Sequence, residues 1–75
     1  MKTLKWNCEN KKYNFYEIPD NWNSKTYCKD MNEVVNCANC GKELPFGECY
    51  TSRIIHTSQG FGYAVCSDCY EKEEK

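Results

Sequence analysis

Two Cys-x-x-Cys pairs are the residues of this 75-residue chain whose types and spacing could most readily do chemistry. Cys37-Ala-Asn-Cys40 and Cys66-Ser-Asp-Cys69 flank residues 41–65. Each pair brings two thiolates close enough to bind one ion, and two pairs supply the four sulfurs of a tetrahedral structural site. The spacing predicts one structural Zn²⁺ bound by Cys37, Cys40, Cys66 and Cys69. Iron is the alternative metal, because it also accepts four sulfurs, and four unrelated buried or redox thiols are the alternative to any metal.

The three other cysteines and the single histidine form a second set of possible ligands: Cys8, Cys28, Cys49 and His56. They could make a site of three cysteines and one histidine, although no two of them form a close pair. In a regular strand, Cys49 and His56 would point to opposite faces, because successive side chains alternate. Cysteine is also a common small buried residue. We therefore expect packing residues here, with a second metal site as the alternative.

The motifs of the chain predict a protein without enzymatic activity. A four-sulfur site leaves no coordination position for a substrate or a reactive water. No His-x-Glu precedes Cys66 at the spacing of a zinc deaminase. The sequence also lacks a His-Glu-x-x-His pattern and a phosphate-binding glycine loop. A zinc enzyme with an open coordination position is the hypothesis that these patterns disfavour.

Aromatic residues are more frequent in the N-terminal part than a small metal finger requires. They make up 15% of the chain, which argues for a folded domain. One interpretation is that they build an N-terminal mini-core. The other is that some of them form a patch that anchors a partner, because Trp and Tyr dominate protein interfaces. The candidate interaction surface consists of Trp6, Tyr13, Phe15, Tyr16 and Trp22.

Charge favours another protein as the partner. The formal net charge is −1, and the chain has no basic run of the kind that neutralises phosphates in most nucleic-acid binders. Nucleic-acid binding is the alternative, through Lys11, Lys12, Lys42 and Arg53. No segment is long and apolar enough for a membrane span or a signal core. We therefore expect a cytoplasmic protein with reduced thiols and no membrane partner; the sequence leaves the oligomeric state open.

The elements that must position the cysteines are short and mostly extended. We expect one domain over residues 1–75, with an aromatic β extension at 1–33 and the four-cysteine zinc-finger core at 34–75. Alternating residues predict an N-terminal hairpin from strands at 4–8 and 13–18. Residues 44–47 are expected to form a turn after the first cysteine pair. A second hairpin follows, with strands at 48–57 and 61–65, and a short helix over residues 67–75 starts at the second pair. A chain this small buries a limited core and needs additional stabilisation of its fold, which the metal would provide.

This order of knuckle, hairpin and helix start resembles the treble-clef class of zinc fingers. The segment Cys37-Ala-Asn-Cys-Gly-Lys-Glu-Leu-Pro-Phe-Gly-Glu also resembles the opening of a LIM-type zinc module, and the likeness covers residues 36–72. A zinc ribbon is the close alternative, with the second pair on a hairpin. The resemblance implies a small metal-stabilised β-rich α+β fold, treble-clef-like with an N-terminal β-hairpin extension, and no particular activity.

Residue usage points to a source with an AT-rich genome. Lysine and asparagine are frequent, and Arg53 is the single arginine. In size and composition the chain resembles small zinc-finger proteins of phages and mobile elements. That resemblance implies an inhibitor or regulator of host machinery, such as RNA polymerase or a CRISPR-type nuclease.

Overall fold

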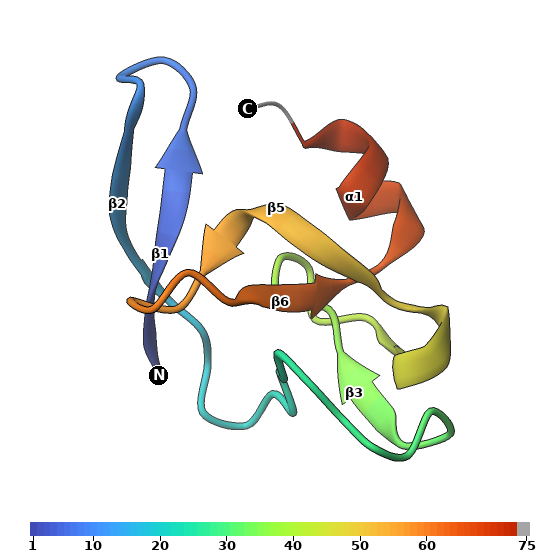
Figure 1. The fold of residues 1–75 in the computed structure, drawn as a ribbon. Helices are drawn as coiled ribbons and strands as arrows, with labels where there is room; N and C mark the ends of the chain where they lie inside the picture. The colour runs from blue at the N-terminus through green and yellow to red at the C-terminus, as the bar shows by residue number, and fades with distance from the viewer. Residues whose placement is uncertain (74–75) are drawn as a thin grey trace.

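In the computed structural model, which describes residues 1–73, two antiparallel sheets and a short C-terminal helix make up the fold (Figure 1). The larger sheet has the order β2-β1-β5-β6, and the smaller one pairs β3 with β4. The elements are β1 (Lys2–Asn7), β2 (Lys12–Glu17), β3 (Val34–Asn36), β4 (Glu43–Pro45), a 3₁₀ turn (Phe46–Glu48), β5 (Tyr50–His56), β6 (Gly62–Val65) and α1 (Ser67–Lys72). The expected β-rich fold, with an N-terminal hairpin and a short C-terminal helix, is confirmed at this level.

The N-terminal hairpin pairs β1 with β2 along their whole length, from Lys2 opposite Glu17 to Asn7 opposite Lys12. The side chain of Asn7 begins the connecting turn, because its Oδ1 accepts hydrogen bonds from the backbone N–H groups of Glu9 and Asn10. Lys11 completes the turn with a φ of 54°. The alternation in the sequence and this local turn chemistry explain why the hairpin is where it was predicted.

Strand β5 joins this hairpin to the cysteine-bearing half of the chain. Both ends of β5 pair with β6, its last two residues also pair with β1, and the register with β6 shifts between Thr51 and His56. The hydroxyl of Ser52 accepts hydrogen bonds from the backbone N–H groups of Ile54 and Ile55, which satisfies donors that the bulge removes from the sheet. The bent strand is visible between β1 and β6 in Figure 1.

The hydrophobic core lies between the larger sheet and the cysteine pairs. Fully buried aliphatic side chains come from four separate segments: Ile18, Val35, Ile55 and Val65. Three of the paired cysteines are buried beside them. So few aliphatic side chains make a small core, and a core of this size is consistent with a fold that is further stabilised by a bound metal.

Two boundaries differ from the sequence-based expectation. Residues 44–47 were expected to be a turn, but β4 extends to Pro45 because the bend at the first cysteine pair returns the chain alongside β3, with Val35 opposite Leu44. The helix was expected over residues 67–75 and ends at Lys72; residues 74 and 75 lie outside the described part. Within residues 1–73, no helix has the length and apolar character needed to cross a membrane.

Candidate metal centre

The first cysteine pair lies in the tight bend between β3 and β4. Cys37 follows β3, and its backbone N–H donates to the carbonyl of Lys42 across the bend. The backbone N–H groups of Asn39 and Cys40 lie 3.4 Å from the sulfur of Cys37. Gly41 has a φ of 81°, a conformation that L side chains rarely adopt. The backbone of this knuckle is therefore shaped to surround a thiolate sulfur with N–H dipoles.

The second pair lies where β6 ends and α1 begins. Cys66 is the N-cap residue of α1. Cys69 lies in the first turn of α1, and its side chain is the one that the helix buries. A helical turn brings residues three positions apart onto the same side. The second pair is thus on a helix start and not on a hairpin, which is the local difference between the two fold classes considered from the sequence.

The four sulfurs come together in the structure. The Sγ atoms of Cys37, Cys40, Cys66 and Cys69 all lie within 4.8 Å of one another. Those of Cys40 and Cys66 are 3.8 Å apart. Zinc–sulfur bonds of about 2.3 Å in a tetrahedron place the sulfurs about 3.8 Å from each other. The donor set and its spacing therefore fit one tetrahedral metal ion.

The thiols of Cys37, Cys40 and Cys69 have shifted pKa values because they are crowded and partly buried. Burial works to raise the pKa of Cys37, but backbone N–H groups of Cys66, Cys40 and Asn39 outweigh it and lower that pKa to about 7. Burial, together with contacts to the other three thiols, raises the pKa of Cys69 to about 12. Burial also raises the pKa of Cys40. Four thiolates cannot coexist here without a cation, and a divalent ion would reverse these upward shifts.

Aromatic and polar side chains of the N-terminal part fix the knuckle to the sheet. The hydroxyl of Tyr16 donates to the carbonyl of Ala38, at 3.0 Å. The amine of Lys5 donates to the Oδ1 of Asn39, at 2.9 Å, and lies over the ring of Tyr16. These contacts connect the N-terminal hairpin to the loop between the first two cysteines. Sequence reasoning missed the Lys5 contact, because nothing in the local sequence pairs it with Asn39.

Trp22 supports the knuckle from another side. A Cβ atom added to Gly41 would lie 2.6 Å from Cζ2 of the Trp22 ring, so the indole packs directly against the glycine. Tyr16 and Trp22 are both partly buried against the core. Tyr16 and Trp22, two of the five aromatic residues predicted for an interaction surface, therefore pack against the knuckle of the first cysteine pair.

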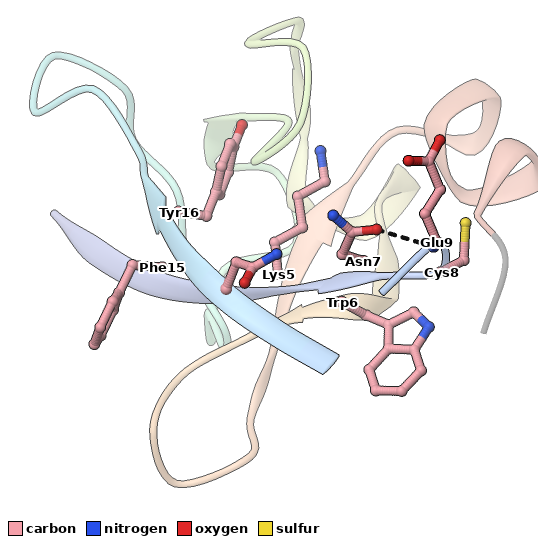
Figure 2. A pocket seen from close by; sticks show the side chains of 8 residues that line it. Lys5, Trp6, Asn7, Cys8, Glu9, Phe15 and Tyr16 are labelled. Carbon is pink, nitrogen blue, oxygen red and sulfur yellow. Dashed lines mark hydrogen bonds between the residues drawn. The ribbon is translucent and has the colours of Figure 1, made fainter. Parts of the chain in front are cut away.

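The other three predicted surface residues, Trp6, Tyr13 and Phe15, lie together on the opposite face of the sheet. Leu4 is opposite Phe15 and Trp6 is opposite Tyr13, so these four side chains share one face. Figure 2 shows Trp6 and Phe15 pointing away from the side on which Lys5, Asn7 and Tyr16 lie. We call the face that bears Leu4, Trp6, Tyr13, Phe15 and His56 the outer face.

The outer face carries an aromatic cluster with a very exposed edge. The rings of Trp6 and Tyr13 meet edge to face with centroids 5.2 Å apart, and those of Tyr13 and His56 do so at 5.7 Å. The Phe15 side chain is 86% exposed. Water contact over so large an apolar ring is unfavourable. The outer face is therefore an exposed aromatic surface of the larger sheet.

The second set of possible ligands stays apart. In the part of the chain that the structure describes, the Cys37, Cys40, Cys66 and Cys69 group is the only one of three or more His, Cys, Asp or Glu residues that could share an ion. Cys28 donates to the carbonyl of Asp30 and Cys49 to that of Pro45, and Cys8 is exposed. The four residues of the second set therefore form no such group among residues 1–73. Cys28 is buried as expected, whereas the expectation of a packing residue is wrong for Cys8, which lies in the exposed hairpin turn.

A search for similar proteins found no matching family, no matching curated protein and no matching solved structure. The functional argument therefore depends on the arrangement of the residues themselves.

Proposed function

We propose that this chain is a non-enzymatic zinc-binding module that binds another protein through its outer face. The observation that carries the proposal is the separation of two features on the sheet. The four sulfurs lie with the inner side chains, where Tyr16 reaches the knuckle. The exposed aromatic cluster lies on the other face. In this proposal the inner face of the larger sheet supports the metal site, and the outer face binds the partner.

Zinc is the metal that we propose for the site. Four thiolates in a tetrahedron suit zinc, because Zn²⁺ is redox-inactive and is commonly bound by four cysteines in structural sites. Iron would accept the same sulfurs. Four protein ligands complete the coordination of zinc and leave no position for a substrate. This supports a structural metal and a protein without catalysis, in a reducing compartment such as the cytoplasm.

The order of the elements supports a treble-clef-like core. A knuckle between β3 and β4 supplies the first two ligands, the β5–β6 hairpin follows, and the start of α1 supplies the last two. The N-terminal hairpin extends the β5–β6 sheet by two strands. In this proposal the zinc finger is the scaffold, and the added strands provide the outer face.

The outer face fits a protein better than a nucleic acid. Trp6, Tyr13 and Phe15 provide aromatic anchors of the kind that carry binding energy at protein interfaces. Of the basic residues considered from the sequence, Arg53 is occupied on the α1 side, where it contacts the carbonyl of Tyr70 and lies over its ring. With a net charge of −1, phosphate neutralisation would be weak.

Nucleic-acid binding is the second candidate, because aromatic side chains on an exposed sheet face can also stack with bases. The two candidates differ in salt dependence. Phosphate contacts make affinity fall steeply as salt rises, whereas an aromatic protein interface is much less sensitive.

As for the protein partner, size and composition support a phage or mobile-element regulator, so RNA polymerase and CRISPR-type nucleases are the first host proteins to test.

The test is affinity capture from the native host on the zinc-loaded protein, with and without nuclease treatment. A protein captured by the wild type should remain after nuclease treatment and be lost with Trp6→Ala plus Phe15→Ala. Tyr27→Ala is the matched control, because Tyr27 is 69% exposed but lies outside the outer face. Capture that disappears with nuclease, or that is equally affected by Tyr27→Ala, would contradict the proposal.

A further inference from the structure

Strand β2 is one edge of the larger sheet and has no strand on its outer side within residues 1–73. It runs for six residues in unbroken register with β1, from Lys12 to Glu17. It contains neither proline nor a bulge, two of the devices that prevent edge strands from pairing, and its charged residues, Lys12 and Glu17, lie only at its two ends. A strand of this kind presents regularly spaced N–H and C=O groups to another strand.

The pairing with β1 identifies which backbone groups point outward. Met1 and Ile18 exchange both backbone hydrogen bonds, each 2.8 Å long. In an antiparallel ladder, hydrogen-bonded and non-hydrogen-bonded pairs alternate along the strand. Counting back from Ile18, Tyr16, Asn14 and Lys12 bond to β1. The N–H and C=O groups of Tyr13, Phe15 and Glu17 therefore point away from the sheet.

These same three residues place their side chains on the outer face, and all three are exposed. The charges along the strand are unequal. Lys11 and Lys12 lie at its start, and Glu17 lies at its end. An antiparallel copy of this strand would bring the basic end of one chain against the acidic end of the other. The edge is thus complementary to itself in both hydrogen bonding and charge.

We propose that β2 is a dimer interface, paired antiparallel with β2 of a second copy around a two-fold axis at Asn14. In this register Tyr13 is opposite Phe15 of the second copy, with both backbone groups directed across the interface. Lys11, in the turn that precedes β2, comes near Glu17 of the second copy. Aromatic pairs and opposite charges placed directly across an antiparallel pair stabilise it.

The proposed register also accounts for the exposure of Phe15. Its ring, 86% exposed in the single chain, would lie against Tyr13 of the second copy. The two larger sheets would become one continuous sheet, and the two outer faces would become one surface. The interface is isologous, so it closes at two copies and leaves no second β2 edge for further growth. The inference does not depend on the proposed partner, because self-association is measured on the protein alone.

The first test is sedimentation velocity of the zinc-loaded protein over a wide concentration range. The wild type should pass from monomer to dimer as concentration rises. Phe15→Ser should weaken dimerisation at least about tenfold. The matched control is Phe61→Ser, because Phe61 is 64% exposed but precedes β6 at the other edge of the sheet. Melting curves of both variants should match the wild type, which separates a lost interface from a lost fold.

The second test exchanges the charges. Lys11→Glu and Glu17→Lys should each weaken the dimer, because each places like charges side by side. The double variant restores opposite charges in a symmetric pair and should recover dimerisation close to the wild-type level. A wild type that stays monomeric at every concentration would overturn the proposal. So would equal effects of Phe15→Ser and Phe61→Ser, or a double charge variant weaker than either single one.

Discussion

At the scale of single residues, the metal centre depends on thiols that differ in their surroundings. The pKa of Cys37 is lowered to about 7 despite burial, because three backbone N–H groups favour its thiolate. Burial and the neighbouring thiols raise the pKa of Cys69 to about 12, and burial raises that of Cys40. One member of the set is therefore ready to bind a cation near neutral pH, and at least two members must first lose a proton.

This difference predicts proton release when zinc binds. At pH 7 the thiols of Cys40 and Cys69 are protonated in the metal-free chain, so zinc binding should release at least two protons per ion. Because the zinc-bound fold holds fewer protons than the unfolded chain, its stability should rise with pH and be lost as the pH falls. Calorimetric titrations in two buffers of different ionisation enthalpy measure the protons released. Binding heats that do not depend on the buffer would contradict the prediction.

Gly41 is a second residue at which the local geometry makes a sharp prediction. Gly41→Ala should destabilise the fold more than Gly60→Ala. Both glycines have positive φ, at 81° and 94°, which costs an alanine about 1–2 kcal/mol. Only at Gly41 would the new Cβ meet another side chain, the Trp22 indole, at 2.6 Å. Urea unfolding of both variants isolates the collision from the backbone strain; equal losses would show that Trp22 does not press on the knuckle.

At the scale of elements, α1 is held on the bulge of β5 by one buried carboxylate. Glu73 accepts a hydrogen bond from the backbone N–H of Arg53 and one from the hydroxyl of Ser52. The guanidinium of Arg53 also donates a hydrogen bond to the backbone carbonyl of Glu73. The carboxylate thus connects the end of the helix that carries Cys69 to the middle of the sheet.

Removing this carboxylate should loosen the helix. Glu73→Ala leaves buried donors without their acceptor and should lower the free energy of unfolding by about 2–3 kcal/mol. Glu71→Ala is the matched control, because Glu71 is an exposed acidic residue of the same helix and should change stability by less than about 0.5 kcal/mol. Thermal unfolding followed by circular dichroism measures both. Similar midpoints for the two variants would show that the Glu73 contacts contribute little.

The elements also show what the sequence could and could not predict. The N-terminal hairpin and the helix start were predictable because alternation, turn residues and the position of Cys66 act over short distances. The contact between the bulge of β5 and Glu73 was not, because Glu73 lies 21 residues from Ser52. That Trp22 packs was one of the two interpretations of the sequence, but its contact with Gly41 was not predicted, since only the fold brings the ring there.

At the scale of the whole molecule, the larger sheet has one face that contacts the cysteine loop and an opposite face that exposes aromatic side chains. Its inner face reaches the cysteine loop through Lys5 and Tyr16, and its outer face exposes Phe15. Substitutions on the two faces should therefore have different consequences. The thiols could be assigned from their spacing, but which aromatic side chains face outward became clear only from the strand register.

We propose that one zinc ion held by four cysteines stabilises this fold, and native mass spectrometry of the purified protein provides the sharpest test. A metal site of this kind contributes on the order of 10 kcal/mol to folding. We predict one zinc per chain, lost together with cooperative unfolding in Cys66→Ser and retained in Cys8→Ser, since Cys8 is exposed and outside the site. Two zinc ions per chain, or a metal-free chain that unfolds cooperatively at the same temperature as the wild type, would contradict the account.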